Sequence, residues 1–178
     1  MFAIGIYLCR KKMREINITF NESDITKRIY AESSYIAKAR ARTGLPDDFI
    51  DTIQATEDDT RVLNGFIKES INESAGTINR YLSPCRTRFI GTEGDNLISI
   101  SFTLPHNAPE STAEALKESI ACFTVARTLQ YWYMSVKPDE ASLHMSKAQS
   151  ELARMRELLG TRTRPAREGY GKGNIIEI

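Results

Sequence analysis

The sequence predicts a mainly α fold: a small helical bundle with an αα-hairpin, a β-hairpin insertion and extended terminal arms. Aliphatic residues recur every three or four positions over 56–82, which indicates an amphipathic helix. Residues 115–134 are apolar almost all round, and 138–160 have a heptad seam, so two long helices are expected to pack together through a tight turn. At 178 residues, the chain suggests one domain, or a compact domain with long arms.

The first 23 residues are predicted to form an N-terminal arm with one strand. Between residues 14 and 20, Ile16, Ile18 and Phe20 alternate with other side chains, which is typical of a strand. The preceding "MFAIGIYLC" is too short to span a bilayer, which needs about 20 residues. Two interpretations of it stay open: a short strand or anchor, or a natural start at Met13.

Residues 24–160 are expected to form the helical domain. Asp24 is predicted to cap a helix from about 25 to 43, whose half-apolar stripe indicates a position on the surface. The next helix is predicted to begin after Thr56, which can accept bonds from first-turn amides. Its apolar stripe consists of Leu63, Ile67, Ile71, Ala75, Ile78 and Leu82.

A β-hairpin is predicted at about 87–104. Turn residues in "GTEGDN" separate two runs rich in strand-forming residues. In the second run, Ile98, Ile100 and Phe102 alternate with serine and threonine, so one face of the hairpin is expected to be covered and the other wet.

The αα-hairpin follows the β-hairpin. Its first helix opens at Ser111 or Thr112 and ends near Val136, and Pro138 fits the first position of the second helix. The predicted seam of the second helix consists of Ala141, Met145, Ala148, Leu152, Met155 and Leu159. We expect this seam to pack along the apolar helix.

Residues 161–178 are interpreted as an extended basic C-terminal arm. The segment combines three glycines and a proline with Arg162, Arg164 and Arg167, and it closes with "NIIEI". The arginines either stay solvated or bind phosphates or acidic partner surfaces. We expect Ile175, Ile176 and Ile178, together with these arginines, to contact another subunit or partner by strand addition.

The residue types argue against catalysis and against a metal or other cofactor. Neither His106 nor His144 has a second ligand at metal spacing, and the three cysteines form no paired motif. Cys122, inside the apolar helix, is interpreted as a core residue rather than a nucleophile. With a net charge of +1, no global field favours nucleic acid or membrane. We therefore expect a non-enzymatic protein in a reducing compartment.

Three consecutive aromatic residues, Tyr131, Trp132 and Tyr133, stand at the end of the apolar helix. On a helix they span about 200°, which one core face cannot cover. At least one ring should therefore point towards a partner or the hairpin. For any single ring, core packing and a subunit contact are both open.

Two helices resemble the small head–tail connector (head-completion or adaptor) proteins of tailed bacteriophages, over about 56–136. The first helix matches the family pattern at Asp58, Asp59, Leu63, Ile67, Ile71, Ile78 and Tyr81. The second helix matches it at Leu116, Ile120, Ala121, Val125, Ala126, Tyr131 and Trp132. The family usually follows its aromatic residues with Asn-Arg, whereas "MSVKP" follows here.

The resemblance implies a viral structural protein without a catalytic site. Such a protein forms a homo-oligomeric ring, commonly of twelve copies, beneath the portal in the virion neck, after assembly in the host cytoplasm. Its partners would be itself, the portal protein, neighbouring neck or tail proteins, and DNA passing through the channel. Either the adaptor or another neck or tail ring fits. The alternative is a small helical nucleic-acid-binding or regulatory protein that uses the basic C-terminal arm.

Overall fold

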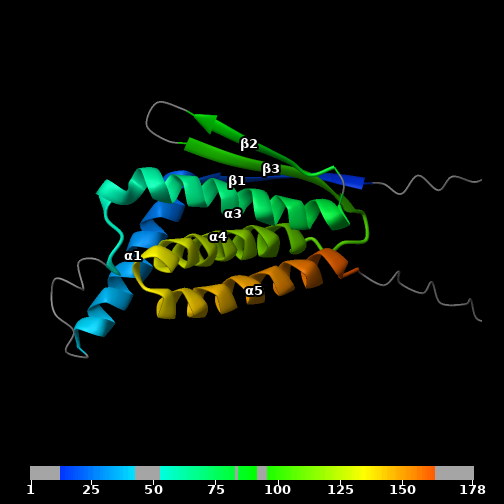
Figure 1. Cartoon of the computed structure of the whole chain (residues 1–178). Helices are drawn as coiled ribbons and strands as arrows, with labels where there is room; N and C mark the ends of the chain where they lie inside the picture. The colour runs from blue at the N-terminus through cyan, green and yellow to red at the C-terminus, as the bar shows by residue number, and fades with distance from the viewer. Residues whose placement is uncertain (1–12, 43–52, 83, 92–95, 163–178) are drawn as a thin grey trace, which may run out of the picture.

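The computed structural model describes residues 13–42, 53–82, 84–91 and 96–162. Its elements, in chain order, are β1 (Met13–Asn21), α1 (Glu22–Ala41), the 3-10 helix η1 (Glu57–Asp59), α3 (Thr60–Tyr81), β2 (Arg86–Gly91), β3 (Asn96–Pro105), α4 (Thr112–Val136) and α5 (Pro138–Gly160) (Figure 1). The predicted mainly α fold class is confirmed by these helices and one small antiparallel sheet. Within the described ranges, no helix is long and apolar enough to cross a membrane.

The sheet has the strand order β1-β3-β2, so β3 lies in the centre. The predicted hairpin is confirmed, because β2 and β3 pair antiparallel from Arg86 opposite Ser101 to Gly91 opposite Asn96. On its other side, β3 pairs antiparallel with β1, over Met13–Asn21. The sequence predicted the strand β1 but not its pairing partner, which lies far along the chain.

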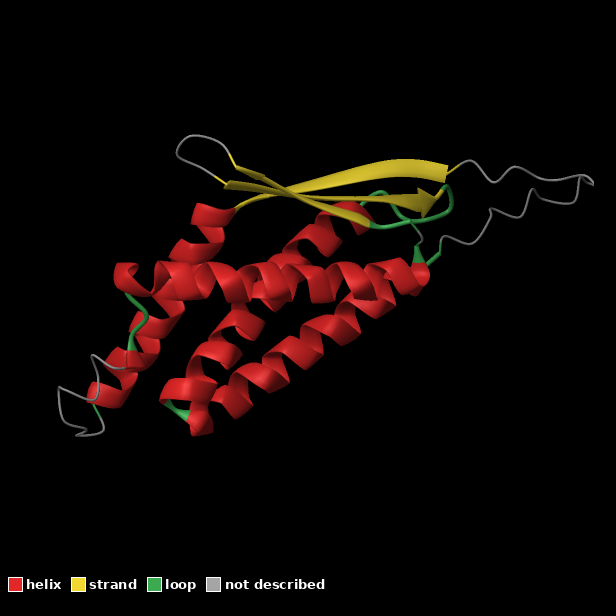
Figure 2. Cartoon of the chain, turned by 45° about the horizontal axis from the view of Figure 1, so that its top comes forward, coloured by secondary structure: helices red, strands yellow, loops and turns green. Residues whose placement is uncertain are grey.

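One face of this sheet is apolar and the helices cover it. Cross-strand pairs place Ile18 opposite Ile100 and Phe20 opposite Ile98, and all four side chains are buried. Figure 2 shows the strands as a layer on one side of the helices. In Figure 1, α3 lies nearest the sheet in the view and α5 lies on the opposite side of the molecule.

Helix α4 occupies the middle of the bundle and contacts α1, α3, α5 and β1. Neighbours on several sides explain why its sequence is apolar almost all round. Leu116, Ile120, Phe123, Leu129 and Tyr133 are completely buried in it. The αα-hairpin of α4 and α5 is confirmed, with Pro138 as the first residue of α5.

Helix α1 begins earlier than predicted. Its first residue is Glu22 and its N-cap is Asn21, so Asp24 lies inside the first turn instead of capping it. The reason is the sheet, because β1 stays paired up to Asn21 opposite Leu97 and the chain then turns directly into the helix. Asp24 still lies in the first turn, where the helix dipole favours an anion.

A capping box between Thr56 and Asp59 lies at the start of the next helix. The Asp59 carboxylate accepts hydrogen bonds from the backbone N–H and the hydroxyl of Thr56, at 2.9 and 3.0 Å. A 3-10 turn, η1, precedes the α-helical part, which begins at Thr60. The predicted stripe is confirmed, because all of its members are buried: Leu63, Ile67, Ile71, Ala75, Ile78 and Leu82.

The predicted seam of α5 is wrong at one position. Met145 is 41 % exposed, and its neighbour His144 is completely buried instead. One residue turns a helix by about 100°, so only one of the two can face α4 at this level. The other predicted members are buried or packed partly against the core: Ala141, Ala148, Leu152, Met155 and Leu159.

Candidate assembly surfaces

The three consecutive aromatic residues of α4 have different surroundings. Tyr133 is completely buried, and its ring stacks on His144 with centroids 5.2 Å apart. Trp132 is partly buried, and its indole N–H donates to the backbone oxygen of Ile53 at 3.3 Å. The expectation that one core face cannot bury all three rings is confirmed, because only Tyr133 is fully enclosed.

Tyr131 is the ring that lies on the surface of the bundle. It packs against Phe66 of α3, with ring centroids 5.4 Å apart, and the Arg127 guanidinium lies 4.8 Å from its centroid. Its hydroxyl donates to the carboxylate of Glu69 at 3.5 Å. Burial is the largest cause that raises the pKa of Tyr131. These contacts hold the ring in a fixed orientation while part of it stays accessible.

Further apolar side chains that are exposed lie within about one helical turn of this ring pair on α3 and α4. Phe66 faces Tyr131, and Glu73 accepts from Arg127 at 2.9 Å, so the two helices run antiparallel here. One turn further along, Val62 of α3 is 50 % exposed and Met134 of α4 is 59 % exposed. We call Val62, Phe66, Tyr131 and Met134 the α3–α4 strip.

The sequence interpretation singled out only Tyr131 from this strip. Val62 and Phe66 lie beside the buried positions Leu63 and Ile67, outside the 3.6-residue stripe of α3. The sequence signal that could have revealed this surface was an apolar residue outside the buried stripe of α3. That Val62 and Phe66 lie beside residues of α4 depends on the tertiary packing.

The outer edge of β2 is a second candidate surface. In the described part of the sheet no strand pairs with that edge, since the order is β1-β3-β2. Three large apolar side chains on this hairpin are exposed: Phe89, Ile90 and Leu97. An exposed, apolar edge strand is a template on which another chain can add a strand.

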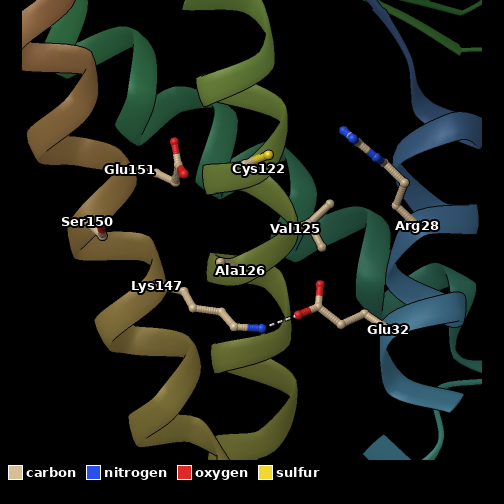
Figure 3. A pocket seen from close by; sticks show the side chains of 8 residues that line it. All are labelled: Arg28, Glu32, Cys122, Val125, Ala126, Lys147, Ser150 and Glu151. Carbon is tan, nitrogen blue, oxygen red and sulfur yellow. Dashed lines mark hydrogen bonds and ion pairs between the residues drawn. The ribbon is translucent and has the colours of Figure 1, made fainter. Parts of the chain in front are cut away.

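A groove of about 340 Å³ lies between α1, α4 and α5 (Figure 3). Val125 and Ala126 of α4 lie between a rim from α1, with Arg28 and Glu32, and a rim from α5, with Lys147. Lys147 forms an ion pair with Glu32, shown by the dashed line in Figure 3.

The ionisable groups around this groove pair with one another. Arg28 donates to the Glu118 carboxylate at 2.8 Å, which lowers the pKa of Glu118. The Cys122 thiol donates to the same carboxylate at 3.3 Å, and burial raises the pKa of this cysteine to about 11. Its thiolate is therefore scarce at neutral pH, which makes it a poor nucleophile. The Arg28–Glu118 and Lys147–Glu32 pairs join α1 to α4 and to α5.

No group of three or more histidine, cysteine, aspartate or glutamate residues that could hold a metal occurs among the described residues. Contrary to its interpretation as a core residue, Cys122 is only partly buried and lines the groove. His144 is enclosed, whereas His106 is exposed.

Only the first arginine of the predicted C-terminal contact set is described. The Arg162 guanidinium donates to the backbone oxygens of Leu159 and Thr161, at 2.6 and 2.7 Å. It thus satisfies a free carbonyl group at the end of α5. The other predicted contacts lie outside the described residues: Arg164, Arg167, Ile175, Ile176 and Ile178.

Comparisons of the chain with protein-family models, curated proteins and solved structures found no match.

Proposed function

We propose that this chain is a structural subunit of a tailed-phage virion: a head–tail connector or adaptor that forms a ring beneath the portal in the neck. The observation that supports this best is the α3–α4 strip. It lies on the two helices whose sequences resemble the connector family, and it presents large apolar side chains to solvent. Contiguous exposed apolar patches are typical of protein–protein contacts.

The chemistry of the strip suits a subunit contact. Tyrosine and other aromatic residues are enriched at the centres of interfaces, where they bury a large area at low conformational cost. Tyr131 is already oriented by Phe66 and Arg127, so its side chain would lose little conformational entropy on binding. In a closed ring, each subunit offers this surface to an unlike surface of its neighbour.

We also propose that the protein acts without catalysis and without a cofactor. The polar groups of the α1–α4–α5 groove support this, because Arg28, Glu118, Lys147 and Glu32 are engaged in ion pairs that join the helices. The proposed partners are further copies of the chain, the portal protein, neighbouring neck or tail proteins, and DNA in the channel. The virion neck is the proposed location.

The test is the mass of the protein in solution, measured by light scattering, alone and with a candidate portal protein. The wild-type chain should form rings alone or on the portal. Tyr131→Glu and Val62→Glu should each abolish this association while keeping the helical circular-dichroism signal. Tyr35→Glu is the matched control, because Tyr35 is 75 % exposed on a different helix, α1, and its substitution should leave assembly intact.

The same experiment separates the proposal from its alternative. A wild-type chain that stays monomeric or dimeric, ignores the portal and binds DNA in a salt-dependent way would instead indicate a nucleic-acid-binding protein. Equal assembly by Tyr131→Glu and Tyr35→Glu would exclude the α3–α4 strip as the contact.

A further inference from the structure

His144 is a completely buried imidazole at the place where α1, α4 and α5 meet. Its ring lies against Tyr133 of α4, with centroids 5.2 Å apart and an angle of 22° between the planes. Within the described part of the chain, neither ring nitrogen has a hydrogen-bond partner, and the Tyr133 hydroxyl has none either. A neutral imidazole has one hydrogen-bond donor and one acceptor, so this packing leaves both without a hydrogen bond.

Three charged groups act on the ring from two elements. Glu32 comes from α1, and Glu140 and Lys147 come from α5 itself. Both carboxylates already have cationic partners: Lys147 pairs with Glu32, while Arg40 of α1 pairs with the buried Glu140. Lys137 also lies 3.8 Å from the Glu140 carboxylate, so a proton on His144 would add a further cation beside carboxylates that already have cationic partners.

We propose that His144 is an acid-sensitive latch between α1 and the α4–α5 hairpin. In the neutral state the ring stays stacked on Tyr133, and the pairs Lys147–Glu32 and Arg40–Glu140 hold α1 against the hairpin. In the protonated state the imidazolium needs water or a carboxylate, so it competes for Glu32 and Glu140 and loosens the first turns of α5. The latch goes beyond the proposed function and does not depend on it.

The direction of the pH effect follows from the burial. Loss of solvation is the largest cause that lowers the pKa of His144, and Lys147 lowers it further, against the opposite effect of Glu32 and Glu140. Above the ordinary imidazole pKa of about 6.5, the ring is neutral in both the folded and the unfolded chain. As pH falls below that value, the unfolded chain takes up the proton first, so stability falls until the pH reaches the pKa of the folded state.

The first test is an imidazole titration by NMR on the full-length, histidine-labelled protein, from about pH 8 to about pH 4.5. The chain has two histidines, and the reference for His144 is its own midpoint in the urea-unfolded chain. His106→Gln assigns the two signals. The titration midpoint of His144 in the folded protein should lie below its midpoint in the urea-unfolded chain. Coincident midpoints would overturn the proposal, without any variant of His144 having to fold.

The second test asks whether the proton opens the junction. Amide hydrogen exchange is compared at about pH 7.5 and about pH 5, after correction for the intrinsic rates, for peptides from 138–148 and from 60–78. Protection of 138–148 should fall more than that of 60–78 in the wild type and in His106→Gln. In His144→Phe, the two regions should respond alike. An unchanged difference in His144→Phe would exclude His144 as the latch, even if rings still form.

Discussion

Replacing Ile120 with alanine tests the placement of α4 at the centre of the bundle. Ile120 is completely buried on a helix that contacts α1, α3 and α5. The substitution removes three carbon groups, worth about 0.8 kcal/mol each, or roughly 2.4 kcal/mol of lost burial. Neighbours on several sides cannot all collapse into the gap, so a cavity term adds to this loss. We expect a decrease of about 2–5 kcal/mol in the free energy of unfolding.

The measurement is urea unfolding followed by far-UV circular dichroism. For a chain of this length, the expected loss corresponds to a fall of roughly 4–20 °C in melting temperature. Val62→Ala is the control, because Val62 is half exposed on α3 and its truncation should change the free energy of unfolding by no more than about 0.5 kcal/mol. A loss below about 0.5 kcal/mol for Ile120→Ala would show that the buried face of α4 is assigned incorrectly.

Three further outcomes are expected. Glu140→Gln removes the carboxylate that Arg40 contacts. Because that arginine is partly exposed, we expect a loss of about 1–3 kcal/mol in the free energy of unfolding. An unchanged urea midpoint would contradict this expectation. Burial raises the pKa of both Cys85 and Cys122 to about 11, so alkylation of these two cysteines should be slow at neutral pH and accelerate until about pH 11. Peptide mapping separates them from Cys9, and fast labelling of Cys85 or Cys122 at pH 7 in the folded protein would refute the assignment. Deletion of 161–178 should preserve the circular-dichroism signal and melting temperature of the free subunit but abolish ring formation or portal binding; full assembly of the truncated chain would rule out an arm-mediated contact.

Much of the local structure was predictable, because local structure follows from the periodicity of nearby residues. The stripe from Leu63 to Leu82 repeats every three or four positions, and all its members are buried. Alternation of Ile98, Ile100 and Phe102 marked the strand and its inward face in the same way. Where caps decide a boundary, long-range pairing overrode the local signal, as the start of α1 at Glu22 shows.

The candidate surfaces were predictable only in part. Three consecutive rings on one helix guarantee that some ring leaves the core, and Tyr131 is a partly exposed ring that packs against Phe66 of α3. The strip also needs Val62 and Phe66, which are far away in sequence and become its neighbours only when α3 packs on α4. No local pattern contains that information, since it depends on which faces of two helices meet.

The sequence by itself therefore determined which segments are helices or strands and which of their faces are apolar, because both depend on residues within a few turns of one another. Only the tertiary structure decided that β1 pairs with β3, and that His144 rather than Met145 enters the core. A rotation of α5 by one residue, about 100°, would bury Met145 in place of His144. The three-dimensional fit against Tyr133 and α1 selects between them, and contacts between distant segments produce that fit.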